Sequence, residues 1–346
     1  MRQAKFLIPG LLSAVLVLLP AATHAQDRHA QDRQTRVIYD TDMGPMTDDV
    51  AALAMLHAMS DQGEAEILAT VASNRHDNIA QVLDIFNTYY GHPNIPIGVP
   101  GGVAVEIKDA PEVCCRGGWT DYLVDHYPTD IRSNEVVSTS TDVYRRVLSQ
   151  QPDSSVTIIT VGFLTNLSNL LTSEPDQYSD LPGEKLVRKK VDKLVSMAGT
   201  FTGPVDDSGS MREYNLYMDE LSSKHVFENW PTEIIFSGFE LGTNVRTAYR
   251  PQETQKDSRN PVRAVFHMVS SGEEGSSFDQ TAVLVGVRGS DPYFDLVEGR
   301  IVVNWDGSNS WDSTGQGQYY LRLNRDHLAQ TEKEIEKLMT HESEIY

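Results

Sequence analysis

Short apolar runs alternate with longer amphipathic stretches along the chain from Thr35 onward, and this alternation restricts the fold more than any other feature. Runs rich in β-branched residues predict buried strands, whereas apolar residues three and four positions apart predict helices. Strands that alternate with helices connect through right-handed crossovers and form a mostly parallel sheet between layers of helix. The predicted strands cover residues 36–39, 67–72, 95–98, 155–160, 194–197 and 232–237, and the predicted helices cover 49–59, 78–90, 141–150, 164–171 and 222–229.

The C-terminal part of the chain departs from this alternation. Residues 291–323 are rich in Gly, Trp, Tyr and Val and contain a turn at Asp306-Gly307, which predicts a β-hairpin or small antiparallel unit. A charged helix on the surface is expected over 330–344, and no linker or low-complexity tract interrupts the chain. We therefore predict an α/β fold, with a mostly parallel central sheet flanked by helices. It forms a single domain over 26–346 that carries a small C-terminal β appendage at about 291–346.

The N-terminal segment has the pattern of a secretory signal peptide. Two basic residues precede an apolar run at 6–19, and Thr23 and Ala25 place small residues at the −3 and −1 positions of a cleavage site. The run is shorter than the roughly 20 residues that span a bilayer, which favours cleavage over membrane anchoring. We expect residues 1–25 to be removed, and the mature protein to be periplasmic or secreted and free of the membrane.

The charge and cysteine content of the chain exclude several classes of protein. A formal net charge of −20 repels nucleic-acid phosphates and anionic membranes, so a nucleic-acid-binding role has no support. The two cysteines, Cys114 and Cys115, are adjacent and cannot bridge each other without strain. The chain therefore lacks an intrachain disulfide framework, and a role for the cysteine pair stays open.

Four aspartates, Asp40, Asp42, Asp48 and Asp49, follow the first predicted strand within ten residues. Ligands of open parallel sheets bind at the carboxyl ends of strands, which is where this acidic loop lies. Thr47 is expected to cap the following helix, whose N-terminus offsets only part of the negative charge. Converging carboxylates therefore favour a hard divalent cation, calcium or magnesium. A solvated turn in which Asp40 only caps the strand is the competing interpretation.

Other strand ends also carry polar or glycine-rich segments. Ser73-Asn74, Val161-Gly162 and Glu240 each follow a predicted strand, so they suit a site shared with the acidic loop. The acidic loop also resembles the Asp-x-Asp segment of haloacid-dehalogenase-type phosphatases, in which the first aspartate is a nucleophile. Met43 fits that segment poorly, and Asp48-Asp49 has no role in it. A magnesium-dependent phosphatase with Asp40 as nucleophile is nevertheless one alternative.

Four segments, in order along the chain, resemble the motifs of the inosine-uridine-preferring nucleoside hydrolases, and the chain looks like an exported, bacterial-type member of that family. They span residues 36 to about 290, nearly the whole predicted core. The segments are Asp40-Thr-Asp-Met-Gly-x-x-x-Asp-Asp49; Val161-Gly-Phe-Leu-Thr-Asn166; Met197-Ala-Gly199 followed by Glu213-Tyr-Asn215 and Asp219; and Phe278-Asp279-Gln-Thr-Ala282.

The resemblance implies a role for each matching residue. Asp42 would act as general base on a calcium-bound water, and the cofactor would be Ca²⁺. The calcium ligands would be Asp42, Asp49, the main-chain carbonyl of Val161 and Asp279. The substrate would be held by Asp48, Asn215 and Asp279 at the ribose hydroxyls, by Glu213 at the 5′ side, and by Asn74 beside the metal.

The expected function is therefore hydrolysis of the N-glycosidic bond of a ribonucleoside or related N-riboside. Carboxylates and amides around the sugar suit its oxocarbenium-like transition state. Phe278 stands where many members of the family carry a histidine that helps the base leave, which leaves base preference open. A non-catalytic sugar- or nucleoside-binding protein of the same fold is the main alternative. The oligomeric state is also left open, a homo-oligomer included.

Two further departures from the family pattern are Met46, in place of an aspartate, and Asp207, near where an asparagine is expected. Asn166 is predicted to cap its own helix. Without the family context, Glu213 and Asn215 would be expected at a surface strand edge.

Overall fold

In the computed structural model of the chain, ten strands of the described residues form one sheet, in the order β11-β10-β12-β7-β6-β5-β1-β2-β3-β4. From β12 to β4 every neighbouring pair is parallel, which confirms the predicted fold class. A separate pair, β8 (Arg246–Thr247) and β9 (Gly275–Ser276), is antiparallel. The strands of the large sheet are β1 (Thr35–Thr41), β2 (Ala65–Ala72), β3 (Ile97–Val99), β4 (Ser138–Thr139), β5 (Val156–Thr160), β6 (Val191–Met197), β7 (Glu233–Ser237), β10 (Phe294–Val303), β11 (Asn309–Asp312) and β12 (Gln318–Leu323).

The structure describes Met1 and residues 34–44, 46–107, 118–202, 212–251, 259–270 and 272–343, and those from Gln34 onward form one compact unit. Residues 2–25 of the predicted signal peptide, Cys114, Cys115 and Asp207 lie outside this described part. In the described part, every helix is too short or too polar to cross a membrane.

Helices cover both faces of the sheet, because residues along each central strand alternate between two apolar cores. In β1, Val37 and Tyr39 belong to one core and Ile38 belongs to the other. The first core contains side chains of α2 (Asp48–Asp61), α3 (Ile79–Tyr89), α4 (Trp119–His126), α10 (Phe239–Asn244), α11 (Pro261–Val269), α12 (Phe278–Arg288) and α13 (Leu328–Met339). The second contains side chains of α5 (Ser140–Gln150), α6 (Thr165–Thr172), α7 (Gly183–Lys190), α8 (Tyr214–Met218) and α9 (Glu220–Asn229).

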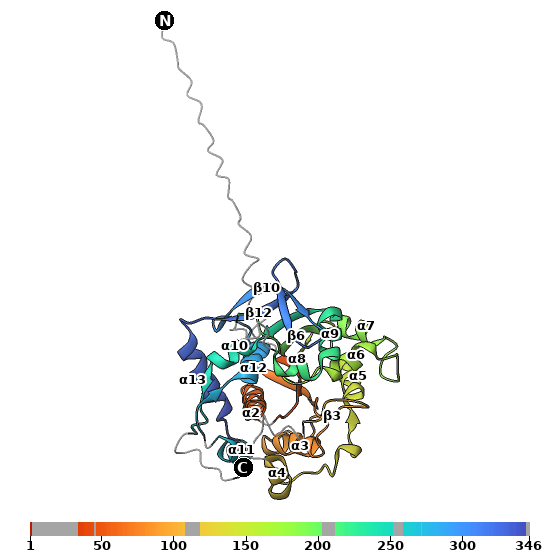
Figure 1. The fold of residues 1–346 in the computed structure, drawn as a ribbon, viewed down its shortest axis with the longest axis vertical. Helices are drawn as coiled ribbons and strands as arrows, with labels where there is room; N and C mark the ends of the chain where they lie inside the picture. The colour runs from red at the N-terminus through yellow and green to blue at the C-terminus, as the bar shows by residue number, and fades with distance from the viewer. Residues whose placement is uncertain are drawn as a thin grey trace. The chain divides into compact units, whose positions relative to one another are not determined.

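Helix α2, which follows the acidic loop, is buried on nearly all sides. It contacts α12, α13, α11 and α3, which surround it in Figure 1. The charged helix predicted at 330–344 is present as α13, but it ends at Met339, and its apolar face buries Ile335 and Leu338 in the core beside α2. Its charged residues lie on the opposite face, which explains why the composition alone suggested exposure.

The C-terminal β unit was predicted as an appendage and proves to be continuous with the central sheet. β10 and β11 form the antiparallel hairpin expected around Asp306-Gly307. β10 also pairs antiparallel with β12, and β12 runs parallel to β7. The hairpin therefore extends the sheet at one edge, where β10 and β12 are blue in Figure 1.

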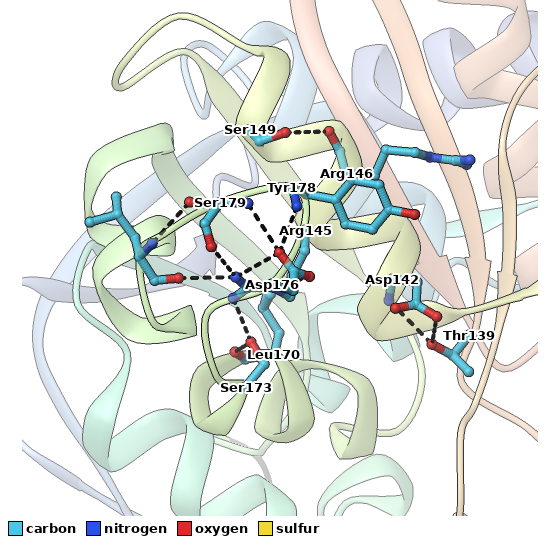
Figure 2. Close-up of polar contacts among 11 residues, drawn as sticks. Thr139, Asp142, Arg145, Arg146, Ser149, Leu170, Ser173, Asp176, Tyr178 and Ser179 are labelled. Atoms are coloured by element: carbon cyan, nitrogen blue, oxygen red, sulfur yellow. Dashed lines mark hydrogen bonds and ion pairs between the residues drawn. The ribbon is translucent and has the colours of Figure 1, made fainter.

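A buried arginine ties α5 to the loop that follows α6, as Figure 2 shows. Arg145 is only 2% exposed and donates to both carboxylate oxygens of Asp176, at 2.7 and 3.1 Å. It also donates to Ser173 Oγ and to the carbonyls of Ser179 and Leu181. These bonds satisfy the buried guanidinium and hold the chain between α6 and α7 in place.

Candidate active site

A cavity of about 230 Å³ lies where β1, β5 and β6 end. This volume is below the roughly 300 Å³ at the lower end of sites for drug-sized ligands, so the cavity suits a small ligand or the sugar part of a larger one. One part of its wall is acidic, and the rest is apolar or aromatic. The cavity is lined by Asp42, Gly44, Met46, Asp48, Asp49, Val161, Met197, Glu213, Tyr214, Asn215, Phe239, Phe278 and Asp279.

The acidic loop folds so that backbone amides point at its own carboxylates. Gly44 N donates to Asp42 Oδ1 at 2.9 Å and to Asp49 Oδ2 at 3.1 Å. Met43 N donates to Asp49 Oδ1 at 3.1 Å, and the hydroxyl of Thr41 donates to the same oxygen. Thr47 lies at the N-cap position of α2 as predicted, but its side chain makes no capping bond. The amides of Met43 and Gly44 fix the two carboxylates in position.

Three carboxylates from this loop and from α12 converge in the cavity. Oxygen atoms of Asp48, Asp49 and Asp279 all lie within 4.8 Å of one another, and all three residues are buried. Burial and then the neighbouring carboxylates raise the pKa of Asp279 well above its usual range, and they raise the pKa of Asp48 to about 7. The pKa of Asp42 is also raised, first by burial and then by Asp49 and Asp48.

This donor set fits a divalent cation. Buried carboxylates that raise one another's pKa values are stabilised by a nearby positive charge, and hard oxygen ligands favour calcium or magnesium. Asp49 and Asp279, both predicted metal ligands, belong to the convergent group, whereas Asp48 was predicted to bind the sugar. Asp42 and Val161 line the same cavity.

Glu213 and Asn215 lie at the start of the short helix α8, and both are buried. Glu213 caps α8 by accepting hydrogen bonds from the amides of Asn215 and Leu216, at 2.9 and 3.1 Å, and it also accepts one from Gly199 N. Burial raises the pKa of Glu213 to about 7. The surface strand edge expected from the local sequence is therefore wrong, because α8 is packed into the molecule.

The side chain of Asn215 connects α8 to two strand ends. Its Nδ2 donates to the main-chain oxygens of Val161 and Met197, both at 3.1 Å. Since these bonds use the amide hydrogens, the carbonyl Oδ1 is the end of the side chain that can meet a ligand.

Asn74 does not line the cavity, although it was predicted to contact the substrate. Its Nδ2 donates to the main-chain oxygen of Asp42 at 3.3 Å, and its Oδ1 accepts from the amides of His76 and Ile107. In this arrangement Asn74 supports the backbone that carries Asp42.

Asp40 points away from the cavity, into a buried polar cluster. Its carboxylate accepts from Tyr144 Oη at 2.8 Å and from Asn166 Nδ2 at 3.1 Å. Asn166 also donates to Ala72 O and accepts from Ser140 Oγ, so it joins three elements and does not cap its own helix as predicted. A fully buried and bonded Asp40 gives the phosphatase alternative no accessible nucleophile.

Aromatic residues form the other wall, and of these the sequence had indicated Phe278 but not Phe239 or Tyr214. Phe278 stacks on Phe239 with ring centroids 5.1 Å apart. Tyr214 lies between Glu213 and Asn215, and this position was the one sequence signal that could have identified it. Its hydroxyl is buried and has no hydrogen-bond partner among the described residues. Burial, followed by the charge of Asp42, raises the pKa of Tyr214 to about 12.

The C-terminal hairpin braces the site from outside the cavity. Asn309 Oδ1 accepts from Thr200 N at 3.0 Å, and Asn309 Nδ2 donates to Thr200 O at 2.9 Å, which holds the loop after β6. Gly307, at the hairpin turn, has φ +77° and packs directly against the backbone of Tyr217 in α8.

The fold and the cavity together define an α/β protein whose cavity, at the carboxyl ends of the strands, carries a cluster of buried carboxylates. The chain belongs to the inosine-uridine preferring nucleoside hydrolase family, because the sequence model of that family matches residues 37–328, most of its length. Among curated proteins, none matches the chain closely enough in sequence to count as a relative.

Solved structures share the fold at low sequence identity. A plant nucleoside hydrolase has a TM-score of 0.66 and 16% identity, covering 89% of this chain and 99% of that one. The inosine-uridine preferring nucleoside hydrolase from Bacillus anthracis has a TM-score of 0.63 and 15% identity, with coverage of 89% and 99%. The type III effector protein XopQ, complexed with adenosine diphosphate ribose, has a TM-score of 0.63 and 12% identity, with coverage of 93% and 99%.

Proposed function

We propose that this protein hydrolyses the N-glycosidic bond of ribonucleosides or related N-ribosides, giving ribose and free base. The proposal rests on one observation, which is that a single cavity has an acidic wall and an aromatic wall. Its carboxylates, with the amide of Asn215, suit the hydroxyls and developing positive charge of a ribosyl group. The stacked pair Phe239 and Phe278 suits a flat aromatic base.

Calcium is the proposed cofactor. Asp42, Asp49, Asp279 and the main-chain carbonyl of Val161 would hold it, and Asp48 is close enough to contribute. When bound, a calcium ion would lower the pKa of a nearby water and bind sugar hydroxyls. An all-oxygen donor set built from several carboxylates is more typical of calcium than of magnesium, which usually keeps most of its waters.

The side chains have complementary proposed roles. Asp42 accepts the proton of the attacking water. The hydrogen bond that Gly44 N donates fixes the Asp42 carboxylate in its position toward the cavity. Asp48, Asp279 and the free carbonyl of Asn215 accept hydrogen bonds from ribose hydroxyls. Glu213 receives the 5′ side of the sugar, and Asn74 supports Asp42 from behind.

A binding protein without catalytic activity is the second candidate. Phe278, stacked on Phe239, has no proton to give to a leaving base. Such a protein would keep the ribose and cation contacts and retain the intact riboside.

We also propose that residues 1–25 direct export and that residues 26–346 act as one domain, in the periplasm or outside the cell. The apolar run at 6–19 and the small residues before Gln26 support this. Sequencing the N-terminus of the mature protein tests it, since retention of residues 1–25 would reject the cleavage.

Residues 26–346 should release ribose from at least one member of a purine and pyrimidine nucleoside panel, and a calcium chelator should abolish the release. Asp42→Asn should lower kcat by about 10²–10⁴-fold, the range typical of a general base. Asp295→Asn, at an exposed ion pair with Arg322, is the matched control and should keep full activity.

Three results would contradict the proposal in different ways. Tight riboside binding without turnover would favour the binding protein. Phosphate release from a phosphomonoester would favour a phosphatase, and full activity of Asp42→Asn would reject the assigned base.

A further inference from the structure

The cavity contains few groups that can donate a hydrogen bond to a departing base. Both carboxylate oxygens of Glu213 already accept hydrogen bonds from backbone amides. Aspartates that hold a cation are ionised and only accept hydrogen bonds, and the Met, Phe and Val side chains of the cavity offer no strong donor. The amide hydrogens of Asn215 are committed to Val161 O and Met197 O. Among the described lining side chains, the hydroxyl of Tyr214 is therefore the donor that remains.

The surroundings of Tyr214 fix its ring and leave its hydroxyl without a partner. The ring lies 6.1 Å from that of Phe163 and is perpendicular to that of Tyr217 at 5.5 Å. A buried hydroxyl without a hydrogen bond costs about 1–3 kcal/mol, and a ligand in the cavity can remove that cost. Tyr214 and Asp42, the proposed base, line the same cavity.

We propose that the hydroxyl of Tyr214 donates a hydrogen bond to the departing base and so stabilises the negative charge that develops on it. This assignment rests on the proposed nucleoside hydrolysis and names the residue that acts where Phe278 cannot. Since the pKa of Tyr214 is raised, the hydroxyl keeps its proton at neutral pH and remains a donor.

The step balances without another reactant. The C1′–N bond breaks and its electron pair goes to the base nitrogen, which accepts the hydrogen bond from Tyr214. The oxygen of water bonds to C1′, and its proton passes to Asp42. Asp42 then loses that proton to solvent, and the base anion takes one up from solvent.

The test compares two leaving groups on Tyr214→Phe. Loss of one donor to a developing negative charge should lower kcat/KM for inosine or uridine by about 10²–10³-fold. Hydrolysis of 4-nitrophenyl β-D-riboside should stay nearly unchanged, because nitrophenolate is stable without a hydrogen bond. The matched control is Tyr217→Phe, on the same helix but outside the cavity lining, and it should leave both rates unchanged.

The ratio of the two rates separates chemistry from folding, since a misfolded variant loses both activities equally. An equal loss on both substrates, or no loss on either, would overturn the assignment of Tyr214. If the unmodified protein hydrolyses neither riboside, the proposed function itself fails and the role of Tyr214 fails with it.

Discussion

Adding calcium to protein freed of divalent ions should raise its thermal stability, because the cation offsets the repulsion within the carboxylate cluster. Oxygen atoms of Asp48, Asp49 and Asp279 lie within 4.8 Å of one another. At an effective dielectric constant of about 20, each ionised pair repels by at least about 3.5 kcal/mol, or about 10 kcal/mol for all three. That is comparable with the whole stability of a typical domain, about 5–15 kcal/mol. The metal-free protein must therefore hold protons in this cluster, and a cation can replace them.

Calcium at about 100 times its dissociation constant should stabilise the folded state by about 2.7 kcal/mol. For a chain of this size, that corresponds to a rise in Tm of about 4 °C. Differential scanning fluorimetry of residues 26–346, with and without calcium, measures the shift. Asp279→Asn should abolish most of it, and the surface control Asp295→Asn should keep it.

The calcium effect should also depend on pH in a defined direction. Burial and neighbouring carboxylates raise the pKa of Asp48 to about 7 in the folded protein. A carboxyl group whose pKa is higher in the folded protein than in the unfolded chain stabilises the folded state most at pH values below its unfolded pKa of about 4. That stabilisation is lost as the pH rises from about 4 through the folded pKa of about 7. Calcium competes with the bound protons, so the rise in Tm should be larger at about pH 8 than at about pH 5. No shift at about pH 8, or an equal shift in Asp279→Asn, would refute the reasoning.

Three further substitutions test how the site is held. Gly162→Ala would place a Cβ 2.5 Å from the amide nitrogen of Asp42 and so displace Asp42. This should lower kcat by about 10²-fold in a ribose-release assay. Wild-type activity would contradict the role of this contact. Asp176→Asn leaves Arg145 buried without its carboxylate and should cost about 1.5–3 kcal/mol in urea unfolding, with nucleoside hydrolysis kept in the folded fraction. Gly307→Ala forces a side chain against α8 at a positive φ and should lower both Tm and kcat/KM, whereas an effect on Tm alone would show that the hairpin does not position the site.

The sequence predicted the central strands well, because buried parallel strands have a strong β-branched pattern. Val156–Thr160 and Glu233–Ser237 lie within one residue of their expected ranges. It also placed most of the site, since the carboxyl ends of parallel strands meet at one edge of the sheet. Asp42, Asp49 and Val161 line one cavity for this reason.

The sequence could not predict features that depend on contacts between distant segments. Helix α8 has five residues, too few for a periodic pattern. Its start is fixed by hydrogen bonds that Glu213 accepts, and the distant Gly307 packs against Tyr217 near its other end. The role of Asn166 was missed because its partners, Asp40 and Ala72, come from other strands. The position of Asp48 beside Asp279 depends on how α12 packs against α2.

The bracing of the site by the C-terminal hairpin has a consequence for the order in which the protein matures. The acidic loop is among the first parts of the domain to be synthesised, whereas Gly307 and Asn309, which hold α8 and Thr200, come near the end. A nascent chain can already contain every proposed catalytic side chain and still lack the support that places them. The protein can therefore act on a substrate only after the C-terminal hairpin has been synthesised.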